Sequence, residues 1–142
     1  IDSNNLATCN VKTNNSQGYK LEWQTNNTSL INANSDTIGA YTPGTPNTPE
    51  NWNIASTDSE WGIKLGSAST TYNSGTWGSD DTYTAGKWLN IDTTPYQFIS
   101  RTDETTQSGD DEYLYFGAEI GSNKFQPTGT YAGSVTITAT TL

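Results

Sequence analysis

The C-terminal stretch of the chain, residues 127–142, is the part of the sequence that most limits the fold. Apolar side chains and threonines alternate along it, with Tyr131, Val135 and Ile137 on one side and Thr136, Thr138 and Thr140 on the other. A period of two residues is typical of a half-buried β-strand. The stretch opens with a Pro-Thr-Gly turn and runs to Leu142, so we expect the fold to close on a sheet strand.

The rest of the composition favours the same fold class. Threonine is abundant, and its branched Cβ suits a pleated surface better than a helix. Only 31% of the residues are hydrophobic, but 5 Trp, 8 Tyr and 3 Phe concentrate the buried area in large rings. At 142 residues the chain fits one domain with one core. We therefore expect a single domain, residues 1–142, that is an antiparallel β-sandwich of the immunoglobulin-like kind.

About seven or eight strands are expected from the alternation of apolar and polar side chains. The clearest ones span residues 9–13, 19–24, 61–65, 88–91, 96–101, 114–120 and the C-terminal stretch. The strongest apolar stripe is predicted to face the core and comprises Leu114, Phe116, Ala118 and Ile120. The alternation also predicts that Tyr19, Leu21 and Trp23 face the core and that Lys64 faces solvent. Residues 25–50, 67–86 and 102–112 are rich in Pro, Gly, Ser or acidic residues, and we expect long loops there or, for residues 25–50, an excursion along a sheet edge.

The charge of the chain excludes several partners. Six Lys and Arg face 15 Asp and Glu, which gives a net charge of -9 and a pI near 4.1. Nucleic acid and anionic lipid need clustered cations, so neither is an expected partner. No apolar run is long enough to span a bilayer. The composition predicts a secreted, extracellular protein at the cell surface, with Cys9 as a buried thiol.

The sequence holds no histidine, and this absence bears on catalysis. A Ser-His-Asp or Cys-His system is impossible, and zinc would lack its commonest nitrogen ligand. A glycosidase with two carboxylates is the scheme that survives, with Glu119 and Glu22 as its candidates, but neither lies in a recognisable motif. We predict that the protein is not an enzyme.

Acidic loops offer one candidate metal site and no other cofactor. Asp110, Asp111 and Glu112 supply hard oxygen ligands of the kind that Ca²⁺ binds. The spacing of an EF-hand loop is absent, and a solvated acidic loop is the competing interpretation.

Three aromatic residues stand in the polar, Gly-rich stretch 67–86. Tyr72, Trp77 and Tyr83 offer flat faces of the kind that stack on the apolar C–H patches of a sugar ring. The competing interpretation is that these rings are buried and anchor the loop.

Two segments carry a resemblance to a known group of proteins. The C-terminal Gly-Thr-Tyr-Ala-Gly-Ser-Val-Thr-Ile-Thr-Ala-Thr and the segment Val-Lys-Thr-Asn-Asn-Ser-Gln-Gly-Tyr-Lys-Leu of residues 11–21 resemble secreted bacterial surface β-sandwich subunits of the pilin-like and spore-coat type. The resemblance implies a hairpin at residues 11–21 and assembly by β-augmentation, in which one copy adds a strand to a neighbour. Only five residues precede Leu6, so an N-terminal donor arm would be short.

The sequence therefore predicts an extracellular structural subunit of a pilus, filament or surface layer that binds copies of itself through strand edges. The residues expected in its assembly strand are Tyr131, Val135, Ile137, Thr138, Thr140 and Leu142. The alternative is a carbohydrate-binding adhesin module that uses its loop aromatics to bind surface glycans.

Overall fold

A computed structural model describes residues 6–142 of the chain. The molecule is nearly all β, with 42% of its residues in strands and 3% in helix. The larger sheet has five strands in the order β1 (Leu6–Val11), β9 (Asp110–Ile120), β6 (Ser59–Leu65), β4 (Thr37–Ala40) and β3 (Leu30–Ile31). The second sheet has the order β10 (Val135–Thr141), β2 (Tyr19–Thr25) and β8 (Tyr96–Arg101). A small ribbon pairs β5 (Glu50–Asn51) with β7 (Lys87–Trp88), and a single helical turn, α1, covers Ser74–Trp77.

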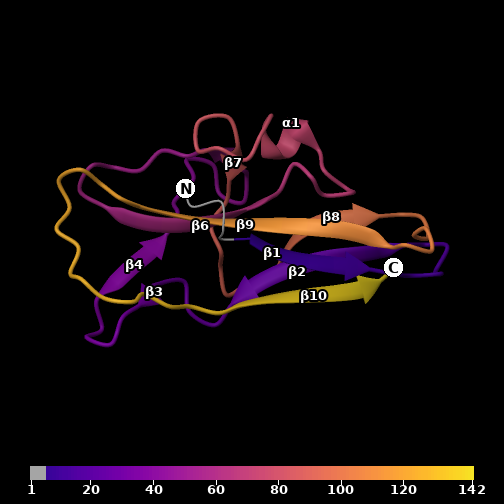
Figure 1. Cartoon of the computed structure of the whole chain (residues 1–142), viewed down its shortest axis with the longest axis horizontal. Helices are drawn as coiled ribbons and strands as arrows, with labels where there is room; N and C mark the ends of the chain where they lie inside the picture. Colours follow the sequence, from indigo (N-terminus) through magenta and orange to yellow (C-terminus); the bar gives the residue numbers. More distant parts are fainter. Residues whose placement is uncertain (1–5) are drawn as a thin grey trace.

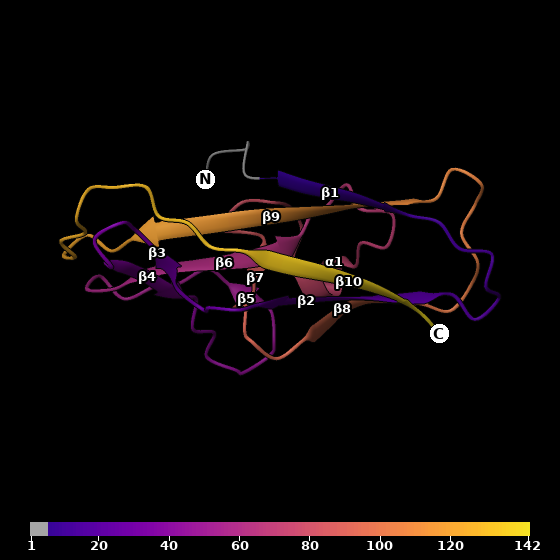
Figure 2. The same cartoon turned by 90° about the horizontal axis from the view of Figure 1, so that it is seen from below.

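The sheets curl, and the predicted antiparallel β-sandwich is not confirmed. Every strand pair is antiparallel except β4 and β6, which run parallel. A bridge between Ile31 and Ala132 links β3 to the segment that leads into β10. The result is a half-barrel. Figures 1 and 2 show that β9 runs along the long axis of the half-barrel and that β2 and β10 lie on the opposite side.

The main core lies between the two sheets and is aromatic. Trp23 on β2 is fully buried and stacks on Phe98 at 4.4 Å and on Tyr96 at 5.4 Å between ring centroids. Trp77 of α1 meets the same indole edge-on at 5.7 Å. The predicted core face of residues 19–24 is thereby confirmed, because Tyr19, Leu21 and Trp23 are all buried.

A second aromatic cluster covers the opposite face of β6 and β9. Trp52 stacks on Tyr41 with 4.6 Å between ring centroids. The rings of Tyr83 and Trp88 pack against Trp52, with centroids 4.9 Å and 5.5 Å from it. Two facing glycines of β6 and β9, Gly62 and Gly117, leave room for these rings. β6 is therefore buried on both faces, and Lys64, which its alternation placed in solvent, is fully buried.

One prediction about the chain path was wrong. Residues 11–21 do not form a hairpin, because β1 pairs with β9 whereas β2 pairs with β10 and β8. Residues 25–50, expected as a long surface loop or an excursion along a sheet edge, contain β4 and β3, and β3 is the edge strand of the larger sheet.

Two further predictions concern the ends of the chain and the membrane. The predicted short donor arm, residues 1–5, lies outside the described residues. None of the helical structure in residues 6–142 is long and apolar enough to cross a bilayer.

Candidate functional site

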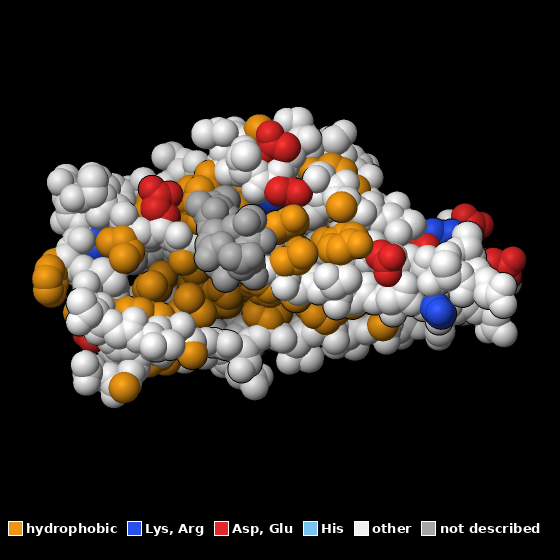
Figure 3. Space-filling model, in the orientation of Figure 1, with side chains coloured by type: hydrophobic (Ala, Val, Ile, Leu, Met, Phe, Trp, Pro, Cys, Tyr) orange, Lys and Arg blue, Asp and Glu red, His pale blue; other side chains and the backbone are white. Residues whose placement is uncertain are grey.

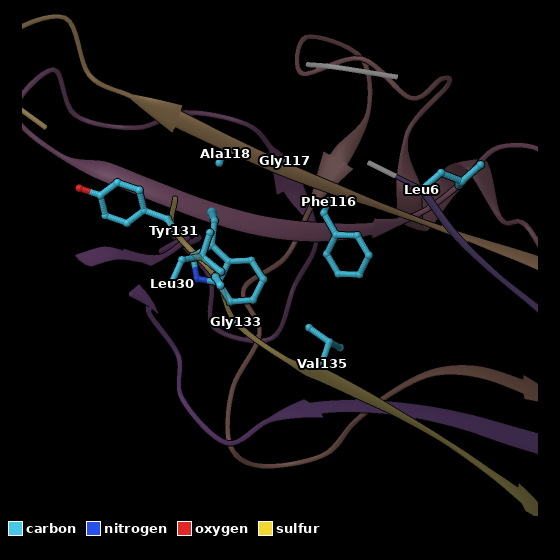
Figure 4. Close-up of a pocket in the computed structure, with 10 residues that line it drawn as sticks. Leu6, Leu30, Phe116, Gly117, Ala118, Tyr131, Gly133 and Val135 are labelled. Carbon is cyan, nitrogen blue, oxygen red and sulfur yellow. The ribbon is translucent and has the colours of Figure 1, made fainter. Parts of the chain in front are cut away.

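A groove lined by apolar side chains opens between the end of β9 and the start of β10. Its cavity has a volume of about 520 Å³. Large side chains from both sheets line it: Leu6, Leu30, Trp61, Phe116, Tyr131 and Val135. Figure 3 shows hydrophobic side chains gathered in this hollow, and Figure 4 shows Phe116 on β9 pointing toward Val135 on β10. Among residues 6–142, the half-barrel thus leaves apolar side chains lining a groove along one side.

Strand edges flank the groove. β1 pairs with β9 only from Asp110 to Tyr115, so within residues 6–142 no strand pairs with Phe116–Ile120 on that side. β10 pairs with β2 on one side and has no strand partner on the other within the same range. Backbone groups along such edges are available to another extended chain.

One backbone carbonyl of β9 already accepts a hydrogen bond from a side chain. The hydroxyl of Tyr83 donates a hydrogen bond of 3.1 Å to the carbonyl oxygen of Ala118. Burial, reinforced by the charge of Glu119, raises the pKa of Tyr83 to about 12, so this hydroxyl stays protonated and remains a donor near neutral pH. An incoming strand would compete with Tyr83 at this one acceptor.

The apolar stripe predicted for β9 is only half covered. Leu114 is buried and Phe116 is half-buried, but Ala118 is exposed and Ile120 keeps 51% of its surface in contact with solvent. The prediction that all four face the core is therefore wrong for the last two. They lie beyond Tyr115, the last β9 residue that pairs with β1 within residues 6–142, at the strand end that borders the groove.

The predicted assembly strand borders the same groove. Val135 and Ile137 are half-buried on β10, whereas Thr138, Thr140 and Leu142 are exposed. Tyr131 precedes the strand and lines the groove, where its hydroxyl donates a 2.8 Å hydrogen bond to the carbonyl oxygen of Pro127. Sequence reasoning missed Leu6, Leu30 and Trp61 as groove residues, because nothing in their local pattern shows that the sheet stays open beside them.

The aromatics predicted to stack on sugar do not form an exposed platform. Trp77 is 2% exposed and packs into the core against Trp23. Tyr83 packs against Trp52 and Trp88, and the hydroxyl of Tyr72 donates to the carbonyl oxygen of Gly78 at 2.7 Å. The prediction is wrong for Trp77, whose ring faces are covered, and the loop-anchoring interpretation describes all three residues.

The predicted calcium site is also not assembled. Asp110, Asp111 and Glu112 lie in β9, where successive side chains point to opposite faces. Asp110 is buried and accepts hydrogen bonds from Arg101, while Asp111 is exposed on the other face. Within residues 6–142 no cluster of three acidic, His or Cys side chains is placed to hold a metal ion.

The two carboxylates considered for a glycosidase lie apart in the fold. Glu22 is on β2 and forms an ion pair of 3.0 Å with Lys20. Glu119 is on β9 in the other sheet and accepts a 2.6 Å hydrogen bond from the indole nitrogen of Trp52. Each carboxylate thus has a local structural partner.

Comparisons with protein-family models, with curated proteins and with solved structures found no match to this chain.

Proposed function

We propose that the protein is a non-enzymatic structural subunit of an extracellular filament, pilus or surface layer, and that its copies associate by strand addition at the groove. The observation that carries this proposal is the apolar groove between two strand edges. An extended segment of a second copy would satisfy edge backbone groups through main-chain hydrogen bonds, and its alternate side chains would enter the groove.

The chemistry of β10 supports a contact between copies. Its sequence, Val-Thr-Ile-Thr-Ala-Thr-Thr, has no charged residue and no proline. Proteins that avoid edge-to-edge pairing commonly protect an edge strand with lysine, proline or a bulge. The uncharged edge also lets two copies approach locally even though each has a net charge of -9.

Strand addition would also change the architecture of the subunit from an open half-barrel to a covered one. An extended segment of a second copy, paired with the free edge of β9 or with that of β10, would extend that one sheet over the open side of the half-barrel. We propose that the assembled subunit thereby becomes the two-layer β-sandwich that the sequence predicts. Apolar surface at Ala118 and Ile120, exposed in the single chain, would be covered in the process.

Sedimentation velocity over a range of protein concentrations, with electron microscopy of the same samples, tests the proposal. Ala118→Asp places a charge in the groove at an exposed position, where the fold itself has little to lose. Burying that carboxylate against apolar side chains is costly, so we expect the variant to associate at least about tenfold more weakly than the wild type.

Ala68→Asp is the matched control, because Ala68 is exposed and does not line the groove. It should associate like the wild type. A wild-type chain that stays monomeric at every concentration, or an Ala118→Asp variant that assembles normally, would contradict the proposal.

A further inference from the structure

A second cleft, away from the apolar groove, is polar and lies where two loops meet. It consists of two adjoining hollows with volumes of about 360 and 320 Å³. Asn47, Asn90 and Asp92 line both hollows and so form the ridge between them. Each volume falls at the lower end of the roughly 300–1,000 Å³ of pockets that hold small molecules.

Several polar side chains of this cleft are not used by the fold. Within residues 6–142, the side-chain amides of Asn47, Asn90 and Gln97 make no hydrogen bond to protein. Oδ1 of Asp92 accepts hydrogen bonds from the backbone N–H and the hydroxyl of Thr93, and its Oδ2 accepts none in the same range. Each amide presents a donor pair and an acceptor, and the carboxylate adds an acceptor. This set matches adjacent hydroxyl groups, each of which both donates and accepts.

Residues with apolar rings line both hollows. Pro43 and Pro46 line the first hollow, and Pro95 and Tyr96 line the second. Tyr96 is held in place by stacking on Trp23 at 5.4 Å. A pyranose has the complementary shape, because its C–H faces are apolar and its edge carries hydroxyls.

We propose that this cleft binds a neutral oligosaccharide, with one sugar ring in each hollow and the hydroxyls between them bound by Asn47, Asn90 and Asp92. Asp92 is the only charged residue among those that line the two hollows. With no cation there, the cleft has nothing to pair with a sialic acid, a uronic acid or a sulfated sugar. The site is independent of the strand-addition groove, since the two share no lining residue.

Saturation-transfer difference NMR with cellotriose, maltotriose, mannotriose and chitotriose tests this site directly. We expect saturable transfer to at least one of the four trisaccharides. The variant Asn90→Ala/Gln97→Ala should weaken that binding by at least about tenfold. Asn47→Gly should also weaken it while keeping the backbone, because Asn47 has a φ of 58° that glycine adopts readily.

Gln107→Ala is the matched control. Gln107 is also an exposed amide, but it lies in the loop that follows β8 and lines neither hollow. It should bind the sugar like the wild type, and circular dichroism should show all variants folded. The proposal is overturned if none of the four sugars gives saturable transfer, or if Asn90→Ala/Gln97→Ala binds as tightly as Gln107→Ala. Either result leaves the assembly proposal intact, because assembly is read by sedimentation without sugar.

Discussion

The hydroxyl of Tyr19 donates a hydrogen bond of 2.9 Å to Oδ2 of Asp110 and so ties β2 in one sheet to β9 in the other. The same hydroxyl lies 3.4 Å from Oε1 of Glu112. Arg101 on β8 reaches Asp110 at 2.8 Å, and Thr71 donates to Glu112 at 3.1 Å. This buried polar network joins the two sheets where β9 begins, at the opposite end of that strand from the groove.

Tyr19→Phe is expected to destabilise the protein by about 1–3 kcal/mol, because it removes a donor from buried carboxylates. Urea unfolding followed by tryptophan fluorescence measures the change. Tyr113→Phe is the control, since its hydroxyl makes no hydrogen bond within residues 6–142, and it should shift stability by less than about 0.5 kcal/mol. Equal effects of the two substitutions would show that the network contributes nothing.

Glu112 should make stability depend on pH. Burial, with a contribution from the charge of Asp110, raises the pKa of Glu112 above its ordinary value of 4.5. The folded state therefore binds this proton more tightly than the unfolded chain does. Its contribution to stability is fully present below pH 4.5 and is lost as the pH rises through the raised pKa.

Glu112→Gln removes that titration. The difference in unfolding free energy, variant minus wild type, should grow in favour of the variant as the pH rises from 4.5 and then level off. Denaturant unfolding at a series of pH values measures it. A difference that stays constant with pH would mean that Glu112 titrates alike in the folded and unfolded chains.

Lys64 is fully buried, and its ammonium group pairs with Asp81 at 2.8 Å and with the carbonyl oxygen of Asp80. Asp81→Asn leaves this cation without its counter-charge, so we expect a loss of about 3 kcal/mol in unfolding free energy. The double variant Lys64→Met/Asp81→Asn should lose less than the single one. Glu22→Gln breaks a more exposed ion pair and should cost less than about 1 kcal/mol.

Asp81 should in addition make the protein sensitive to acid. Burial opposes ionisation of Asp81, but hydrogen bonds from Lys64 and Ser67 outweigh it and lower the pKa of this carboxyl below its ordinary value of 3.8. Its contribution to stability is therefore present above pH 3.8 and is lost as the pH falls through the lowered pKa. In Asp81→Asn, unfolding curves should lack this loss, and an unchanged acid profile would contradict the assignment.

Gly62 should tolerate no side chain. A Cβ added there would lie 2.8 Å from the carbonyl oxygen of Leu89 and 3.0 Å from the ring of Trp52. We expect Gly62→Ala to lower stability by about 1–3 kcal/mol through overpacking, measured as a shift in Tm. Gly39→Ala is the control, because its Cβ would meet its nearest neighbour at an ordinary 3.7 Å. If both variants melt together, the second aromatic cluster is looser than its contacts indicate.

Phe125 offers a test of association that is separate from the groove. Its ring is 86% exposed in the loop before the final strand, so burying it in a contact between copies would gain apolar area at no expense to the fold. Phe125→Ser should leave Tm unchanged and weaken association in sedimentation velocity. A variant that assembles normally would remove Phe125 from the interface.

The sequence predicted the class of the fold and much of its core, because alternation reports directly on which strand faces are buried. Tyr19, Leu21 and Trp23 lie where the pattern placed them. It could not predict Lys64, since alternation does not reveal that the aromatics of distant loops cover the second face of β6. It also could not show which strands pair, so β1 and β2 were wrongly joined as a hairpin.

The candidate sites were harder to predict than the fold. The stripe that ends in Ala118 and Ile120 looks like core in sequence, but within residues 6–142 both side chains are exposed and no strand pairs beside them on the β1 side. Asn47 and Asn90 come from separate loops, and no local motif shows that they meet. The acidic run at Asp110 predicts a loop ligand, and its charge gives no sign that this residue begins a strand.

The pairing of β1 with β9 has a consequence for the kinetics of folding. Leu6 lies opposite Tyr115, and Val135 near the other end of the chain lies opposite Thr25. Both contacts close very long loops, and topologies dominated by such contacts fold slowly, on the order of milliseconds to seconds. The first strand must therefore wait for nearly the whole polypeptide before it finds its partner, and during that interval the chain is most open to capture by a neighbour.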